Sequence, residues 1–241
     1  RQVDGQIRLN LGDKAYDIAK TPMEKMQKLR GNYMSMIFQE PMTSLNPVFR
    51  IGEQVEEVIE LHDGEGKSKE EIKARTIELL EMVGIANSEG VYKMYPHELS
   101  GGMRQRVGIA RAFVSSPKVI FADEPTGNLD SRTSKQVLYR MLELSKNNHV
   151  TFVMVTHEPE LAECADRIVT ILDGKVCSNV VQDEETKKKN RDALFADLEG
   201  DLDIGGEAAK EQSAKKPSPK GEGARRADEG QCSHSTPAKE E

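Results

Sequence analysis

The chain has 241 residues, of which 37% are hydrophobic, and this is enough to bury one substantial core. Lys and Arg number 34 against 41 Asp and Glu, so the net charge of −7 provides no overall positive field for nucleic acid. We therefore expect no nucleic acid among the main partners. The sequence also contains no apolar run near the roughly 18 residues of a membrane helix.

The three cysteines, Cys164, Cys177 and Cys232, are odd in number and widely spaced. Their spacing fits neither a paired disulfide framework nor a metal site. We interpret them as reduced thiols, which is typical of a reducing compartment.

In chain order, the first clear pattern is a pair of amphipathic helices over residues 52–62 and 69–83, with no strand pattern between them. Short apolar strands rich in β-branched residues appear only further along the chain. We therefore predict an inserted helical subdomain over about residues 48–115.

The linker between these two helices contains Gly66, Lys67 and Ser68, the residue types that close a phosphate-binding loop of pattern G-x-x-x-x-G-K-[ST]. Such a loop follows a strand, whereas a helix is expected here, and Leu61 stands where the first glycine is required. We interpret Gly64 and Gly66 as helix breakers and Ser68 as the cap of the second helix. No other position in the chain matches the loop.

The stretch PHELSGGMRQR contains a second helix start. Ser100 is a good N-cap residue, and Gly101 and Gly102 have no Cβ that would block a close approach. A helix predicted from Met103 onward would offer free N–H groups and a positive dipole end to an anion. Taken alone, this pattern is weak evidence, because many Ser-Gly turns precede helices.

Two runs, VIFA at residues 119–122 and TFVMV at 151–155, are apolar throughout, which predicts central parallel strands covered on both faces. The first run ends in Asp123 and Glu124, and the second is followed by His157. Open α/β sheets bind ligands at the carboxyl ends of their strands. An acidic pair at that edge suits a Mg²⁺-nucleotide site, since Mg²⁺ binds carboxylate, water and phosphate oxygens.

From residue 182 to 241 the composition becomes highly charged and rich in Lys, Pro, Gly and Ser. Its only large apolar side chains are Leu194, Phe195, Leu198, Leu202 and Ile204. We expect most of this tail to be disordered, with at most one short amphipathic helix that docks on the body or on a partner. The folded domain is accordingly predicted to span residues 1–181.

Four segments together resemble the ATP-binding subunits of ABC transporters: MIFQEP at 36–41, LSGGMRQR at 99–106, VIFADEPTGNLD at 119–130 and VTH at 155–157. The resemblance covers about residues 1–180. It implies an α/β fold with a P-loop NTPase-like, mostly parallel sheet flanked by helices, an inserted helical subdomain and a disordered C-terminal tail. The family's phosphate loop and its adenine-stacking aromatic residue would precede this chain, so we expect the chain alone to be inactive.

The resemblance implies ATP and Mg²⁺ as cofactors and assigns roles to matching positions. Asp123 would hold Mg²⁺ through its outer shell, and Glu124 would act as general base on the attacking water. His157 would hydrogen-bond the γ-phosphate and the water. Gln39 would contact Mg²⁺ and water when ATP is present and would couple the site to a membrane partner.

The remaining implied positions belong to a dimer. Ser100, Gly101 and Gly102 would clamp the γ-phosphate of ATP held by a second ATP-binding subunit, with Gln105 among the nucleotide-binding residues. Asp130 would cross the interface of this head-to-tail dimer. Transmembrane permease subunits would be the other partners, which implies a peripheral location on the cytoplasmic face of the cell membrane.

The resemblance is mixed within the family. Residues 36–55 and 95–112 resemble the peptide and nickel importer ATPases, whereas residues 122–134 and 156–168 resemble the lipoprotein-release and macrolide-export ATPases. Peptides or related small solutes are the expected substrates. Three alternatives remain: an ABC ATPase of DNA maintenance or translation, one that regulates a membrane complex without transport, and an inactive truncated product.

Overall fold

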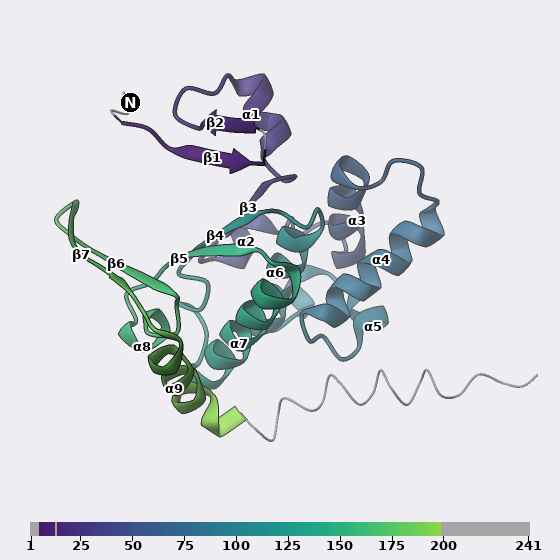
Figure 1. Ribbon diagram of the computed structural model, residues 1–241. Helices are drawn as coiled ribbons and strands as arrows, with labels where there is room; N and C mark the ends of the chain where they lie inside the picture. Colours follow the sequence, from purple (N-terminus) through teal and green to yellow (C-terminus); the bar gives the residue numbers. More distant parts are fainter. Residues whose placement is uncertain (1–4, 13, 199–241) are drawn as a thin grey trace, which may run out of the picture.

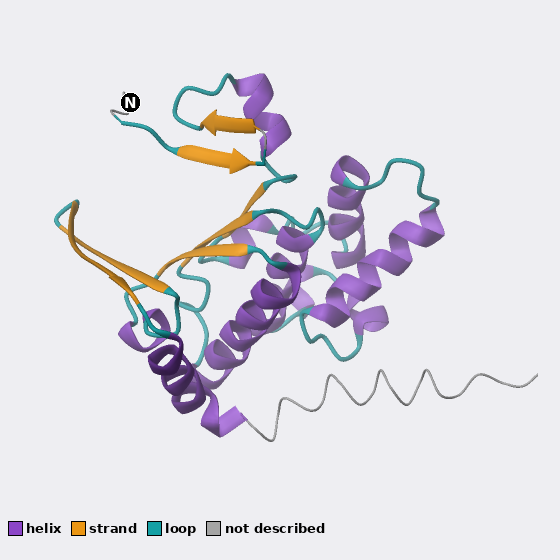
Figure 2. Ribbon diagram, in the orientation of Figure 1, coloured by secondary structure: helices purple, strands orange, loops and turns teal. Residues whose placement is uncertain are grey.

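The computed structural model describes residues 5–12 and 14–198. Its centre is a three-stranded parallel sheet of β3 (Met34–Ile37), β4 (Val119–Asp123) and β5 (Thr151–Val155), with β4 in the middle (Figures 1 and 2). The strands come from distant parts of the sequence and are connected through helices, as parallel strands require. This confirms the α/β class and the parallel sheet that the sequence predicts.

One face of this sheet is covered by helices and the other is open. Helices α6 (Gly101–Phe113) and α7 (Ser131–Asn148) share a core with Ile120 and Ala122 of β4. Phe121, which points to the opposite face, is 41% exposed. The expectation that both strands are central and covered on both faces is therefore wrong within the described residues, because β5 lies at the sheet edge and helices cover one face only.

A lobe of helices adjoins the sheet, made of α3 (Ile51–His62), α4 (Lys69–Met82) and α5 (Ser88–Tyr92), followed by the 3₁₀ turn η1 (Pro96–Glu98). It lies beside α6 in Figure 1. The two predicted helices of this region are confirmed, and their apolar faces enter the main core.

Two antiparallel hairpins lie away from this core. β1 (Arg8–Leu11) pairs with β2 (Lys14–Asp17) ahead of α1 (Met23–Leu29). The second hairpin, β6 (Arg167–Leu172) with β7 (Lys175–Val181), follows α8 (Pro159–Ala162) and projects from the body (Figure 1). None of the helices in residues 5–12 and 14–198 has the length and apolar character needed to cross a membrane.

The chain continues past residue 182 as an ordered helix. α9 (Glu184–Phe195) and the short turn η2 (Ala196–Leu198) dock beside α7 and α8. A small second core forms there from Leu138, Leu161, Cys164, Leu194, Phe195 and Leu198. The expected docking helix is present, but the predicted domain end at residue 181 is too early, since the apolar side chains of α9 and η2 gather on one buried side. The expectations for Leu202, Ile204 and Cys232 lie outside the described residues.

Candidate functional site

The carboxyl ends of β4 and β5 lie side by side. Glu124 follows β4 directly, and its backbone N–H donates to the carbonyl of Val155, the last residue of β5, at 2.9 Å. The φ angle of Glu124 is +39°, a conformation that non-glycine residues rarely adopt. Backbone outliers of this kind cluster at functional sites, where they fix the direction of a side chain.

The Glu124 carboxylate is held by two other predicted residues. Gln39, which follows β3, donates from Nε2 to Glu124 Oε2 at 2.6 Å, and His157 Nδ1 lies 3.0 Å from Glu124 Oε1. Because an ionised carboxylate only accepts hydrogen bonds, His157 donates from Nδ1 in this contact. The Glu124 side chain is 28% exposed and that of His157 is 71% exposed. The sheet thus brings Gln39, Glu124 and His157 together at one edge, open to solvent.

The loop between β4 and α7 adds two residues to the site, Gly127 and Asn128, for which the sequence predicts no role. A Cβ on Gly127 would lie 3.3 Å from Glu124 Oε2 and 3.4 Å from Gln39 Nε2, so a larger residue would crowd this pair. Asn128 Nδ2 donates to the backbone carbonyl of Gln39 at 3.4 Å. The only sequence signal for them is a Gly-Asn pair shortly after the acidic pair.

Asp123 ends β4 and is exposed on the open face of the sheet. The Gln39 bond to Glu124 uses Nε2, which leaves the Oε1 atom of Gln39 as a further oxygen ligand at this edge of the sheet. These oxygen donors suit Mg²⁺, which takes few protein ligands and completes its shell with water and phosphate oxygens. Within the described residues there is no cluster of three or more His, Cys, Asp or Glu that would hold a metal by itself.

The second predicted group lies at the start of α6, next to the start of α7. Ser100 caps α6 by accepting a hydrogen bond from the Met103 N–H at 3.3 Å, which confirms its expected capping role. A Cβ on Gly102 would approach Thr133 Cγ2 to 2.5 Å, so a glycine is needed where the two helix starts meet. The N-terminus of α6 remains exposed at Ser100.

Asp130 lies at this same junction. It caps α7 by accepting a hydrogen bond from the Thr133 N–H at 3.0 Å. The hydrogen bonds from Thr133 hold the pKa of Asp130 below its usual range, so the carboxylate is charged at neutral pH. Asp130 and Glu124 are the two ends of one short loop, which joins the group at α6 to the group around Glu124.

Gln105 lies inside the molecule. Its side chain is 2% exposed, and its Nε2 donates to the backbone carbonyl of Phe38 at 3.3 Å. This corrects the sequence-based expectation of a nucleotide contact at Gln105. The residue instead supports the segment that carries Gln39, because it lies on the buried side of α6.

Comparison with known proteins identifies the family of this site. The sequence model of the family described as ABC transporter matches residues 1–127. The chain belongs to this family. Its fold is accordingly that of the ABC ATPase cassettes.

Two curated relatives carry peptide-transport names. The oligopeptide transport ATP-binding protein AppD of Bacillus subtilis is 45% identical over 76% of this chain and 54% of its own length. The dipeptide transport ATP-binding protein DppD of Haemophilus influenzae is 42% identical over 66% of this chain and 48% of its own length. The chain therefore spans about half the length of the curated relatives it matches.

A solved structure is also similar. The ATP-binding cassette MJ0796, in a dimeric post-hydrolysis state with ADP and phosphate, shares 32% identity with a TM-score of 0.60. The alignment covers 68% of this chain and 68% of that chain. This likeness agrees with the parallel sheet and adjoining helical lobe described above.

The GEGKS stretch of this ABC cassette is a linker between helices. It lies between α3 and α4, where the Ser68 hydroxyl accepts from the Glu71 N–H at 3.3 Å and the Glu71 carboxylate accepts from the Ser68 N–H at 2.7 Å. Lys67 is hydrogen-bonded to the Asp63 carboxylate. The interpretation of Ser68 as a helix cap is confirmed.

Proposed function

We propose that this chain is the ATP-binding and ATP-hydrolysing part of a subunit that powers an ABC transporter for peptides or related small solutes. The observation that carries the proposal is the contact of the Glu124 carboxylate with both Gln39 and His157 at the carboxyl edge of the sheet. Family membership and the peptide-transport names of the relatives support the reaction class and the substrate class.

In this proposal Glu124 is the general base. Each carboxylate oxygen can accept more than one hydrogen bond, so an attacking water can bind Glu124 while Gln39 and His157 hold its orientation. The water then gives its proton to Glu124 as its oxygen attacks the γ-phosphorus, and the bond from the γ-phosphorus to the β-phosphate oxygen breaks, so that ADP leaves. His157, which is more exposed than Glu124, lies on the solvent side of the Glu124 carboxylate, where the γ-phosphate would bind.

Asp123 and Gln39 would hold Mg²⁺ in this site, since both present side-chain oxygens at the sheet edge. The bound ion supplies positive charge that neutralises the phosphate oxygens. Asp123 would contribute its carboxylate to the outer coordination shell of the ion. Both oxygens of Glu124 would remain available to Gln39, His157 and water.

We also propose a head-to-tail dimer in which the exposed start of α6 meets the nucleotide of a second ATP-binding subunit. Ser100, Gly101 and Gly102 present the first N–H groups of α6, which favour an anion. Asp130, charged and exposed at the neighbouring helix start, lies at the same interface. The residues at the start of α6 would then contact one nucleotide, and the residues around Glu124 would contact another.

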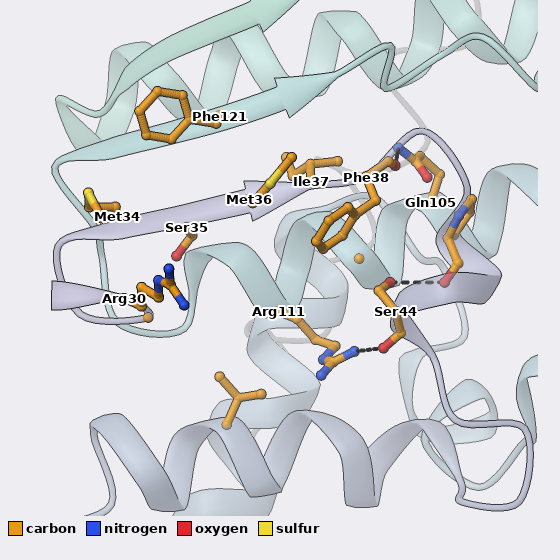
Figure 3. Close-up of a pocket in the computed structure, with 14 residues that line it drawn as sticks. Arg30, Met34, Ser35, Met36, Ile37, Phe38, Ser44, Gln105, Arg111 and Phe121 are labelled. Atoms are coloured by element: carbon orange, nitrogen blue, oxygen red, sulfur yellow. Dashed lines mark hydrogen bonds between the residues drawn. The ribbon is translucent and has the colours of Figure 1, made fainter. Parts of the chain in front are cut away.

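A pocket of about 530 Å³ between the sheet and the helical lobe is the proposed docking site for a permease subunit (Figure 3). β3 and the two residues that follow α1, Arg30 and Gly31, line one side. Val58 of α3 and Arg111 of α6 line the other. The segment that borders it also exposes the apolar side chains of Met42, Val48 and Phe49. In this arrangement a partner helix would contact the segment that carries Gln39, at the cytoplasmic face of the membrane.

Crosslinking tests the docking site. A cysteine at Met42, which is 37% exposed, should crosslink to a cytoplasmic helix of the permease, and a cysteine at Lys146 should not. Leu45 is an unsuitable second position because it is only 2% exposed. Crosslinks from Lys146 alone would contradict the proposal.

The role of Glu124 is tested in an ATPase-competent form of the protein that carries a phosphate loop ahead of residue 1. Glu124→Gln keeps the size and the hydrogen bonds of the side chain but cannot accept the proton, so hydrolysis should fall about 10²-fold or more. ATP should still bind, and size-exclusion chromatography with ATP and Mg²⁺ should show a stable dimer. Asp123→Asn should weaken Mg²⁺ retention and the dimer together. Hydrolysis near the wild-type rate in Glu124→Gln would show that another residue is the base.

Calorimetric titration of the 241-residue chain with ATP tests the expectation that the chain is inactive on its own. We expect no micromolar, Mg²⁺-dependent binding, because the chain contains no G-x-x-x-x-G-K-[ST] stretch. Tight binding would show that the phosphates are held by other residues of this chain.

A further inference from the structure

Side chains from two helices hold the backbone of the segment that follows β3. α6 provides two of them: Gln105, which donates to the Phe38 carbonyl, and Arg111, whose guanidinium donates to the Ser44 carbonyl (Figure 3). α3 provides the third, Gln54, which donates to the carbonyls of Asn46 and Phe49 at 3.0 and 2.9 Å. Helix side chains therefore fix four backbone carbonyls along residues 38–49.

The two side chains from α6 hold the two ends of one short piece of chain. Phe38 precedes Gln39 directly, and Ser44 ends the single helical turn α2 (Pro41–Ser44). Gln39 lies between the two anchored carbonyls, so the place from which it reaches Glu124 is set by α6.

The Gln105 side chain is buried, and Arg111 is half-buried. Gln105 is 2% exposed, and burial lowers the pKa of Arg111. The Arg111 Nε atom is buried and has no hydrogen-bond partner among the described residues, so the bond to Ser44 is a principal compensation for burying this charge. Loss of that bond would therefore release Arg111 and the segment together.

We propose that Gln105 and Arg111 are positioning residues that tie the Gln39 segment to α6, the helix whose first turn carries Ser100. Gln105 lies about 7.5 Å along the helix axis from Ser100, within one rigid element. A displacement of α6 at its Ser100 end then moves the Phe38 and Ser44 carbonyls and changes the contact between Gln39 and Glu124. The anchoring stands on contacts alone, and only its effect on hydrolysis rests on the proposed function.

A fluorescent reporter tests the anchoring in the chain as it is. The sequence has no Trp, so Met42→Trp places a single indole between the two anchored carbonyls, at a position that is 37% exposed. Gln105→Met and Arg111→Met remove the donors and keep a similar volume. We expect each to raise the acrylamide quenching constant of the reporter roughly two-fold, since the segment opens locally. Arg111→Lys, which keeps a charged donor, should restore most of the protection.

Arg106→Met is the matched control on the same helix. Arg106 is also a guanidinium whose burial lowers its pKa, but it donates to the Gly84 carbonyl at 2.6 Å and to Gln136 at 3.1 Å, away from the segment. Its loss should leave the quenching unchanged. Unchanged quenching in Gln105→Met and Arg111→Met, or an equal rise in Arg106→Met, would overturn the anchoring.

A second measurement separates this inference from the proposed function. In the assembled, ATP-hydrolysing complex, Gln105→Met should lower kcat several-fold with little change in the KM for ATP, because it misplaces Gln39 without touching the nucleotide. An increased quenching constant together with an unchanged kcat would overturn the link from α6 to Glu124. Absence of hydrolysis in the wild-type complex would instead overturn the proposed function, and the quenching result would decide the anchoring by itself.

Discussion

The helical lobe and the β6–β7 hairpin stabilise the same chain in different ways. In α3 and α4, Ile59, Leu79 and Leu80 are 0% exposed and belong to the main core. In the hairpin, Leu172 is 65% exposed and Val181 is 72% exposed. The lobe therefore gains its stability from burial, whereas the hairpin depends on its backbone ladder and on the turn at Gly174.

Substitutions of apolar residues should therefore affect stability very differently in the two regions. Apolar side chains of the same type occur in both regions, so residue type alone does not distinguish them. Burial of apolar area is the dominant favourable term in folding, and it is present in one region and nearly missing in the other. Matched pairs of residues can test this contrast directly.

The largest expected effect comes from one leucine in each region. Leu80→Ala, in the lobe core, should lower the free energy of unfolding by about 2–5 kcal/mol, because it removes buried methyl groups and leaves a cavity. Leu172→Ala, in the hairpin, should change it by less than about 0.5 kcal/mol. Urea denaturation of both variants measures the difference. Equal losses would mean that the hairpin is buried in solution.

The second prediction concerns α9, whose docking extends the folded part beyond residue 181. Phe195 is 8% exposed, and its ring packs edge to face on Tyr139 at a centroid distance of 5.4 Å. Phe195→Ala should cost about 2–3 kcal/mol, less than in a main core because α9 can detach locally. Phe49→Ala, at a position that is 51% exposed, is the control. Hydrogen exchange should rise in residues 184–198 of the first variant only.

A third, smaller effect is expected at a helix cap. Ser68→Ala should lower the free energy of unfolding by about 1 kcal/mol, because the Glu71 N–H loses its partner at the start of α4. The hairpin offers a matched hydroxyl in Ser178, which bonds to the Thr170 hydroxyl at 2.8 Å on an exposed surface. Ser178→Ala should be close to neutral. Thermal unfolding of the two variants compares the sites, and a larger loss at Ser178 would contradict the prediction.

The smallest effect is a pH dependence of α9 docking. Hydrogen bonds from Thr186 lower the pKa of Asp183, and a hydrogen bond from Lys135 lowers the pKa of Asp197. Because both values lie below the ordinary 3.8, their contribution to stability is fully present above that pH. This contribution to stability is lost as the pH falls through the folded-state pKa values of the two carboxylates.

Hydrogen exchange of residues 184–198, corrected for its intrinsic pH dependence, should therefore rise more steeply below pH 3.8 than exchange in α6, which is capped by Ser100. The double variant Asp183→Asn/Asp197→Asn is the control. Asparagine at 183 caps α9 about as well as aspartate, and neither asparagine titrates. An unchanged acid response in this variant would assign the effect to other groups.

Much of the candidate site could be predicted because its residues follow strong local patterns. Asp123, Glu124 and His157 come directly after apolar runs of strand length, and parallel strands bring their carboxyl ends to one edge. Ser68 and Ser100 precede amphipathic helices as caps. In each case the signal lies within a few residues of the feature that it predicts.

The supporting residues could not be predicted in this way. Gln105 and Arg111 bond to carbonyls that lie 67 residues away in the sequence, and a carbonyl acceptor leaves no trace in residue identity. The same limit hides the bond from Asn128 to the carbonyl of Gln39, 89 residues away. The roles of these side chains appear only when the segments are side by side.

From the sequence alone, local patterns predicted the helices over residues 52–62, 69–83 and from Met103 onward, the strands β4 and β5, and the acidic edge, since periodicity, capping residues and apolar runs act over a few residues. They did not predict β1, β2, α1, β3 or α2. Which strand face is covered, where α9 docks and what holds the Gln39 segment depend on contacts between distant elements. Phe121 and Ile120 are neighbours of similar hydrophobicity, yet one is 41% exposed and the other 0%. Their difference depends on which face α6 and α7 reach, and burial against distant elements is a property of the assembled fold.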